Sequence, residues 1–200
     1  MNRVTINELL NNDNMLSAFC EDMQNGAVAI VPTDTLYGFA VAANNIAAVN
    51  KVYEIKHRDA RKPLILFVTK PSELTEMGFE ISKEALNAIE KYWPGALTAI
   101  FKTVSSPIVS AFNFPTMGVR IPAHNALINL MEKLPFKLLT TSANRSGAPS
   151  DIDPSKIELE FMNEVDWLID GGKLTESLPS TIVDFSVTPY KILRQGKITL

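Results

Sequence analysis

The chain shows its α/β character most clearly in one stretch, GAVAIVPTDTLYGFAVAANNIAAVNKVYEIK, which covers residues 26–56. Ala27–Val31 is a short apolar run with β-branched members that ends at Pro32, and this pattern predicts a buried strand. Gly38–Ala42 predicts a second strand. In Ile46–Lys56 the apolar residues return to three- and four-residue spacing, which is typical of an amphipathic helix. The stretch therefore predicts two strands followed by a helix.

The same alternation of strands and helices continues on both sides of this stretch. Further helices are expected at Asp13–Asn25, after a cap at Ser82, around Leu127–Met131 and from Pro154. Further strands are expected at Leu64–Val68, Leu97–Phe101, Val119–Ile121, Leu138–Thr141, Thr181–Val183 and Ile192–Arg194 and near Leu168. No repeat and no linker divides the chain, so the sequence predicts one α/β domain over residues 1–200 with a mixed sheet.

Composition and charge argue against several classes of protein. With 46% apolar and 20% charged residues, the chain has the composition of an ordinary globular protein rather than a disordered one. Its net charge of −3 argues against a binder of bulk polyanions. The apolar runs are too short to span a bilayer, and the N-terminal residues lack the apolar core of a signal peptide, so we expect a cytoplasmic protein without a membrane partner. One cysteine and two separated histidines argue against a disulfide and against a transition-metal site.

The familiar sequence motifs of nucleotide binding and hydrolysis are absent. None of the nine glycines lies in a G-x-x-x-x-G-K-[ST] or a G-x-G-x-x-G pattern, which argues against a P-loop and against a dinucleotide fold. No G-x-S-x-G motif of a hydrolase occurs either. Any nucleotide site must therefore be built from other residues.

The densest group of charges lies in residues 51–62. Five basic residues fall in this segment, against two acidic ones: Lys51, Lys56, Arg58, Arg61 and Lys62. One interpretation is a solvated helix end, where cations complement the helix dipole. The other is an anion-binding turn, in which Lys56, Arg58 and Lys62 converge on one ligand and donate charge-assisted hydrogen bonds to phosphate oxygens. The residues alone leave both interpretations open.

Three short polar clusters lie at the ends of predicted strands, namely Pro32–Thr35, Thr140–Asn144 and Ser180–Thr181. Each alone is typical of a turn or a cap, but ligands of α/β sheets bind beyond the strand ends, where hydroxyl groups supply orienting hydrogen bonds. Arg120 and Arg194 are lone charges in apolar strands, so each forms either a structural ion pair or part of a ligand site. Together these residues predict a basic, hydroxyl-rich cleft for a small anion, with phosphate as the leading candidate.

Seven segments, in a fixed order along the chain, carry a family resemblance. They are Pro32–Gly38, Lys56–Arg58 with Lys62–Leu64, Trp93–Thr98, Val119–Pro122, Thr141–Asn144 with Ser146–Gly147, Ser180–Asp184 and Ile192–Gly196. This order resembles the YrdC-like family of threonylcarbamoyl-AMP synthases from about residue 15 to residue 196, including the family's K-x-R and S-x-N signature. The resemblance implies a twisted mixed sheet with flanking helices around a positively charged concave cavity. Because the chain ends six residues after Arg194, it resembles the short, single-domain form of the family.

The resemblance also implies an activity. Members of the family join L-threonine, bicarbonate and ATP to L-threonylcarbamoyl-AMP and release pyrophosphate. A transferase complex similar to TsaD, TsaB and TsaE then transfers the threonylcarbamoyl group to adenosine 37 of tRNA, which gives t6A. The implied enzyme is a nucleotidyltransferase of tRNA modification, with Mg²⁺ carried by the ATP phosphates and no metal ligand from protein side chains.

Positions that match the family's motifs imply a role for each candidate site residue. Contacts with L-threonine are implied for Thr35, Arg120, Thr140 and Ser180. Contacts with ATP are implied for Arg58, Lys62, Thr116, Ser142, Ser150 and Arg194. The implied catalytic group is Lys56, Arg58, Ser142 and Asn144. One position departs from the pattern, because Phe67 stands where some relatives place a histidine near threonine.

Three functions fit these observations. In the first, a synthase, the carbamate of threonine attacks the α-phosphorus of ATP, and cationic donors offset the repulsion between the two anions. No general base is needed once the carbamate exists, because its oxygen is already ionised. The second function is a non-catalytic factor that binds tRNA or double-stranded RNA, which the basic cavity favours and the net charge opposes. The third is a paralogue that acts on another carboxylated amine, which Phe67 favours and the intact signature opposes.

Overall fold

One large β-sheet runs through the computed structural model, which describes residues 1–103, 114–175 and 178–200. Eleven strands form this sheet in the described residues. They are β1 (Asn2–Thr5), β2 (Ala29–Val31), β3 (Gly38–Ala42), β4 (Ile65–Phe67), β5 (Phe79–Glu80), β6 (Leu97–Thr103), β7 (Thr116–Arg120), β8 (Leu138–Ser142), β9 (Trp167–Asp170), β10 (Thr181–Asp184) and β11 (Lys191–Arg194).

All the helices of the described residues except α4 (Ser72–Glu76) begin where the sequence provides a capping side chain. They are α1 (Ile6–Asn11), α2 (Asp13–Gln24), α3 (Ile46–Lys56), α4 (Ser72–Glu76), α5 (Lys83–Tyr92), α7 (Asn125–Lys133) and α8 (Pro154–Phe161). Asn45 accepts a hydrogen bond from the backbone N–H of Ala48 at the start of α3, and Ser82 does the same for Ala85 at the start of α5. Such caps satisfy N–H groups that have no partner within the helix. Cap and apolar spacing together therefore fix these two helices locally.

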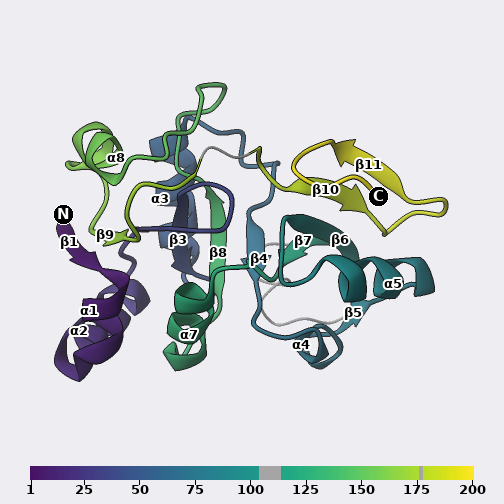
Figure 1. Ribbon diagram of the computed structural model, residues 1–200, viewed down its shortest axis with the longest axis horizontal. Helices are drawn as coiled ribbons and strands as arrows, with labels where there is room; N and C mark the ends of the chain where they lie inside the picture. The colour runs from purple at the N-terminus through teal and green to yellow at the C-terminus, as the bar shows by residue number, and fades with distance from the viewer. Residues whose placement is uncertain (104–113, 176–177) are drawn as a thin grey trace.

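The sheet is mixed, as the alternation of elements predicted. Its strands follow the order β1-β9-β2-β3-β8-β4-β7-β6-β10-β11, and β5 pairs with β6 beside this path. The neighbours β1/β9, β2/β9, β4/β7 and β6/β10 run parallel. The neighbours β2/β3, β3/β8, β4/β8, β6/β7, β5/β6 and β10/β11 run antiparallel. Figure 1 shows this sheet as the middle layer, with helices above and below it.

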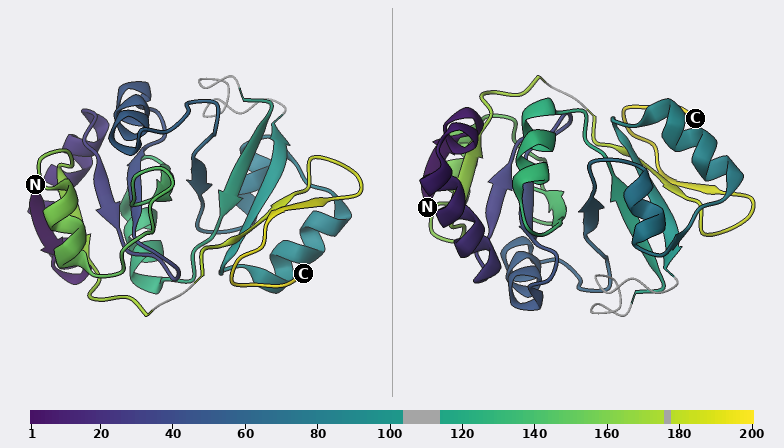
Figure 2. Two further views of the ribbon diagram at one scale, coloured as in Figure 1. Left: turned by 90° about the horizontal axis from the view of Figure 1, so that it is seen from above. Right: turned by 90° about the horizontal axis from the view of Figure 1, so that it is seen from below.

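The core lies on both faces of the sheet. Phe39 and Val41 of β3 point into one apolar cluster, together with residues of α3 and α8, whereas Ala40 and Ala42 point into a second cluster with α1, α2 and α7. This alternation follows from the two-residue period of a strand. Figures 1 and 2 show α3 and α8 on one side of the sheet and α1, α2 and α7 on the other. A strand buried on both faces explains why Gly38–Ala42 has no polar residue.

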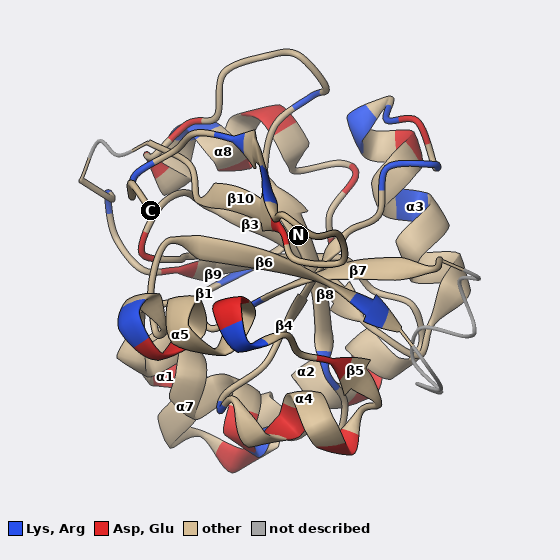
Figure 3. Cartoon of the chain, turned by 90° about the vertical axis from the view of Figure 1, so that its right-hand side faces the viewer, with Lys and Arg blue, Asp and Glu red and all other residues tan. Residues whose placement is uncertain are grey.

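Charges of both signs share the surface. Figure 3 shows Lys and Arg next to Asp and Glu on α3 and on α5, in agreement with the low net charge. No helix among the described residues has the length and the apolar character needed to cross a membrane. Because both signs of charge share α3 and α5, we expect the predicted group of basic residues in a cavity rather than on a helix face.

Candidate active site

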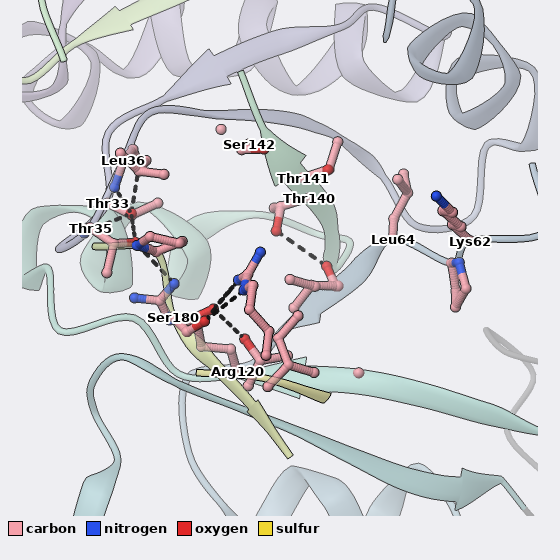
Figure 4. Close-up of a pocket in the computed structure, with 18 of the residues that line it drawn as sticks. Thr33, Thr35, Leu36, Lys62, Leu64, Arg120, Thr140, Thr141, Ser142 and Ser180 are labelled. Atoms are coloured by element: carbon pink, nitrogen blue, oxygen red, sulfur yellow. Dashed lines mark hydrogen bonds between the residues drawn. The ribbon is translucent and has the colours of Figure 1, made fainter. Parts of the chain in front are cut away.

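A cavity of about 950 Å³ opens at the ends of the central strands. It lies between the β2–β3 connection, the loop after α3, the end of β8, and the strands β4, β7, β6 and β10 (Figure 4). All but two of the predicted site residues line it: Thr35, Arg58, Lys62, Arg120, Thr140, Ser142, Asn144, Ser150, Ser180 and Arg194. The fold therefore brings together in one cavity residues that are up to about 160 positions apart in the chain.

Strand register explains why hydroxyl and guanidinium groups share one wall. On β8, Thr140 and Ser142 are two residues apart, so their side chains point to the same face. Thr140 pairs with Ile65 of β4, and Ser142 pairs with Gly38 of β3. On β7, Arg120 stands in register with Phe67 of β4 and points to that face too. The side chains of alternate residues on three strands thus form the floor of the cavity.

Arg120 is buried at this floor, with 4% of its surface exposed. Its Nε donates to the backbone carbonyl of Gly95 at 2.9 Å, and one terminal nitrogen donates to Thr35 Oγ1 at 3.1 Å. The other terminal nitrogen donates to the carboxylate of Asp34 at 2.6 Å. Burial lowers the pKa of Arg120, and the adjacent Asp34 opposes that shift. Arg120 therefore forms a structural ion pair and also lines the cavity, so the ion pair does not exclude a role in a ligand site, which stays a prediction.

The turn before β6 places the carbonyl that Arg120 uses. Gly95 allows a close approach there, because a Cβ atom at this position would lie 2.4 Å from the backbone oxygen of Tyr92. Trp93 anchors the turn by donating its indole N–H to the carbonyl of Leu97 at 2.8 Å. The Trp93–Gly95 segment thus supports the site through its backbone.

Arg194 reaches the cavity from β11. Its Nε and one terminal nitrogen donate to the backbone carbonyl of Ser180 at 3.0 and 2.8 Å, and the same terminal nitrogen donates to Ser180 Oγ at 3.1 Å. Ser180 Oγ also lies 2.8 Å from Thr98 Oγ1. The pKa of Arg194 is lowered by burial and then by the charges of Arg120 and Arg58. Three arginines therefore act electrostatically on one region, which favours an anionic ligand.

The loop after α3 forms the more open wall. Arg58 is half-buried and donates to the carbonyls of Lys62 and Pro63, each at 3.3 Å, and burial lowers its pKa. Lys62 is exposed and lines the cavity. Arg61 lines it as well and forms an ion pair with Asp59 at 2.7 Å. The anion-binding interpretation of this segment fits Arg58 and Lys62 better than that of a solvated helix end.

Lys56 occupies a different place from the one its predicted role implied. It is 1% exposed, does not line the cavity, and lies beneath the loop that carries Ser142 and Asn144. Its ammonium donates to the carbonyl of Ser142, to the carbonyl of Asn144 at 2.7 Å and to Asn144 Oδ1 at 3.1 Å. Burial lowers the pKa of Lys56 to about 8, with a smaller contribution from Arg58. Ser142 Oγ donates to Asn144 Oδ1 at 2.6 Å, so Lys56 supports the loop that forms part of the cavity wall.

Three further positions complete the comparison with the sequence analysis. Thr116 begins β7 but does not line the cavity. Phe67 is 4% exposed and lines the floor beside Arg120, where it adds an apolar surface. The sequence places Asp34 in the polar cluster Pro32–Thr35 without a role of its own, and no local signal connects it with Arg120, which lies 86 positions away. In the described ranges, no three His, Cys, Asp or Glu side chains are grouped to hold a metal ion.

Comparison with known proteins places this chain in a family. The Sua5_yciO_yrdC family model, described as telomere recombination, matches residues 21–196. The threonylcarbamoyl-AMP synthase of Pyrococcus abyssi is 32% identical over 179 residues, which cover 89% of this chain and 53% of that protein. A putative threonylcarbamoyl-AMP synthase of Methanocaldococcus jannaschii is 36% identical over 181 residues and covers 90% of this chain and 84% of that protein.

Solved structures give the same result. The crystal structure of P. abyssi Sua5 complexed with L-threonine superposes with a TM-score of 0.83 at 28% identity, over 98% of this chain and 56% of that chain. Escherichia coli YciO shares the fold with a TM-score of 0.81 at 24% identity, over 92% of this chain and 90% of that one. The chain thus spans about half the length of the P. abyssi relative. It belongs to the Sua5/YciO/YrdC family.

Proposed function

We propose that this protein is an L-threonylcarbamoyl-AMP synthase, which condenses L-threonine, bicarbonate and ATP and releases pyrophosphate. The observation that carries this proposal is the division of one cavity into two kinds of cation. Arg120 is held in a fixed position by three protein groups, as a receptor for a carboxylate requires. Arg58 and Lys62 on the loop after α3, and Arg194 on β11 beside Ser180, also line the cavity and add the charges that a polyphosphate requires. Relatives named threonylcarbamoyl-AMP synthase and a relative's complex with L-threonine support the same assignment.

The proposed amino-acid end contains Thr35, Arg120, Thr140 and Ser180. Arg120 would bind the α-carboxylate of threonine. Thr140 Oγ1 donates to the carbonyl of Ile65 at 3.3 Å, which leaves its lone pairs free to accept from the substrate. Phe67 would contact the substrate through its apolar ring. This arrangement leaves the amine of threonine to face the nucleotide.

The proposed reaction needs positioning and electrostatics more than proton transfer. The neutral amine of threonine first adds to CO₂, which forms from bicarbonate and a proton with loss of water, and the amine releases one proton to solvent to give an N-carboxylate. A carbamate oxygen then forms a bond to the α-phosphorus of ATP, while the bond from that phosphorus to the bridging oxygen breaks and its electron pair leaves with pyrophosphate. Arg58, Lys62 and Arg194 would offset the negative charge that gathers on the phosphates. Mg²⁺ bound to the ATP phosphates supplies further charge neutralisation.

Ser142 and Asn144 would border the phosphates at the end of β8. Lys56 would act on them indirectly, because its ammonium holds their backbone carbonyls rather than facing the cavity. Ser150 also lies on the cavity wall and would contact the nucleotide. A contact between Thr116 and ATP stays a prediction from the family resemblance, because Thr116 does not line the cavity.

In this proposal the product is passed to a threonylcarbamoyl transferase complex, which modifies tRNA in the cytoplasm. Five of the 19 Lys and Arg residues line one cavity, namely Arg58, Arg61, Lys62, Arg120 and Arg194, and this local concentration supports a small anionic ligand over direct binding of tRNA or double-stranded RNA. A polyanion would need an exposed basic surface, whereas both signs of charge alternate on α3 and α5.

Pyrophosphate release tests the proposal. The protein is incubated with Mg²⁺, ATP, bicarbonate and L-threonine, and each component is omitted in turn. The proposal predicts release only when all four are present. Release without threonine would indicate a nucleotide hydrolase instead, and release with other amines but not with threonine would indicate the paralogue.

A further inference from the structure

Arg120 has more hydrogen-bond donors than its protein partners use. A guanidinium group carries five N–H donors. In the part of the chain that the structure describes, three of them bind protein oxygens, on Gly95, Thr35 and Asp34. Because Arg120 lines the cavity, the remaining two are available to a ligand carboxylate. The orientation of these two donors depends on what holds the other three.

Asp34 is placed behind Arg120 and not in the cavity. Its side chain is 11% exposed, and it forms the shortest of the three contacts, at 2.6 Å. The neighbouring residues Thr33 and Thr35 line the cavity, whereas Asp34 does not. A carboxylate that approaches from the far side holds the guanidinium without occupying the ligand position.

The connection between β2 and β3 holds Asp34 firmly. Thr33 Oγ1 accepts from the backbone N–H groups of Thr35 and Leu36, each at 3.1 Å, and donates to the carbonyl of Leu36 at 2.6 Å. Lys197 donates to the backbone carbonyl of Asp34 at 3.3 Å. Figure 4 shows the Thr33–Leu36 turn beside the Arg120 guanidinium. The carboxylate therefore sits on a turn whose own polar groups are satisfied.

We propose that Asp34 is a positioning residue that orients Arg120, so that its two remaining N–H donors meet the α-carboxylate of the amino-acid substrate. This inference rests on the proposed function. Asp34 does not contact the substrate in this arrangement, and it affects binding only through Arg120. At metal sites, groups that orient the ligating side chains contribute about 10- to 100-fold to affinity or activity, and we expect an effect of the same order for Asp34. The same carboxylate also neutralises a buried charge, so its effect on binding must be separated from its effect on folding.

The test is calorimetric titration of L-threonine into the wild-type protein and into Asp34→Asn, in the presence of a non-hydrolysable ATP analogue. Asparagine keeps the shape and an acceptor oxygen but loses the charge. The affinity for threonine should fall about 10- to 100-fold, while the affinity for the ATP analogue should stay within about twofold because Arg58, Lys62 and Arg194 remain.

A matched control is Asp170→Asn. Asp170 forms an ion pair with Arg3 at 2.7 Å, its side chain is 17% exposed, and it does not line the cavity. It therefore reports the cost of losing an Asp–Arg pair elsewhere, and it should leave the affinity for threonine unchanged. If Asp34→Asn does not fold, Asp34→Glu keeps the negative charge but moves it by one methylene group. That variant should also bind threonine more weakly.

Two results would overturn the inference. Unchanged threonine affinity in both Asp34 variants would make the ion pair purely structural. Tighter threonine binding in Asp34→Asn would mean that Asp34 competes with the substrate for Arg120. A wild-type protein that binds no α-amino acid would instead overturn the proposed function, and the inference with it.

Discussion

The floor of the cavity and the loop after α3 differ in how their cations are held. On the floor, Arg120 is buried and fixed by a carboxylate, a hydroxyl and a backbone carbonyl. On the loop after α3, Arg58 makes two long contacts to carbonyls within the described residues, and Lys62 is exposed. The floor is therefore organised before a ligand arrives, whereas the loop after α3 leaves its charges available.

This difference suits two ligands of different character. A small amino acid makes few contacts, so the protein binds it more tightly when the side chains of the site are already fixed and lose no conformational entropy on binding. A triphosphate offers many oxygens and a large charge, so mobile cations can bind it without a fixed geometry. The four predictions below test whether the floor and the loop after α3 bind different substrates or act together on one ligand.

The largest effect is expected from Arg120→Leu. Threonine binding should be lost, and ATP affinity should change little, because the other cations remain in place. The variant also leaves Asp34 buried without a partner, which should lower the free energy of unfolding by about 3–5 kcal/mol. Calorimetry on the folded fraction and denaturant titration measure the two effects. Arg3→Leu, which removes two ion pairs of a residue that does not line the cavity, is the control for general destabilisation. Retained threonine affinity would place the amino-acid pocket elsewhere.

The discrimination between threonine and serine tests how closely the floor of the cavity encloses the side chain of the amino acid. Serine lacks only the methyl group of threonine, and one missing methyl group in a close-fitting pocket lowers efficiency by about 10- to 200-fold. The measurement is kcat/KM for pyrophosphate release with each amino acid. Equal efficiency for both would show that this end of the cavity does not enclose the side chain, against the account given for Phe67 and Thr140.

The role of the loop after α3 in binding ATP is tested by Arg58→Ala and Lys62→Ala. Each should weaken ATP binding by about 1.5–3 kcal/mol, the usual contribution of a charge-assisted hydrogen bond. Threonine affinity should not change. The free energy of unfolding should change by less than about 1 kcal/mol for the exposed Lys62, because surface charges contribute little to folding, and by somewhat more for Arg58, which also loses its contacts with two carbonyls. Nucleotide titration and thermal denaturation check both points. A large loss of stability with intact ATP affinity would support the solvated helix end instead.

The smallest effect is expected from pH. Lys56 has its pKa lowered to about 8, so it is charged below that pH and neutral above it. A neutral amine has one N–H donor fewer, and it can no longer serve all three oxygens of Ser142 and Asn144. ATP affinity should therefore fall a few-fold as the pH rises through 8.

ATP is titrated alone for this measurement, since the amine of threonine and bicarbonate have their own ionisations. In Lys56→Met the affinity should be low and independent of pH over the same range. A pH profile in Lys56→Met identical to that of the wild type would assign the titration to another group.

Much of the fold could be predicted because its signals are local. The bounds of β3 and α3 agree with the sequence analysis, and α8 begins at Pro154 as predicted. The elements that were missed, β1, α1, α4 and β5, are short. β1 forms only because it pairs with β9, with Asn2 opposite Trp167. For α1 a signal was present, since Thr5 and Glu8 form a capping box.

The site was less predictable because its geometry is non-local. The motifs indicated which residues gather, and most of them do line one cavity. They did not indicate that Lys56 lies beneath the Ser142–Asn144 loop, or that Asp34 holds Arg120 across 86 positions of sequence. Residue types and order predict the members of a site, whereas strand register and burial decide which of them face the ligand.

The most direct test of the proposed function is the fate of labelled bicarbonate. The protein is incubated with ATP, Mg²⁺, L-threonine and carbon-13-labelled bicarbonate, and the adenylate product is analysed by mass spectrometry. The account predicts an adenylate that contains threonine and one labelled carbon, and it predicts that Arg120→Leu and Arg58→Ala both reduce this product, each through a different substrate. An adenylate of threonine without the label, or no threonine-dependent adenylate at all, would contradict it.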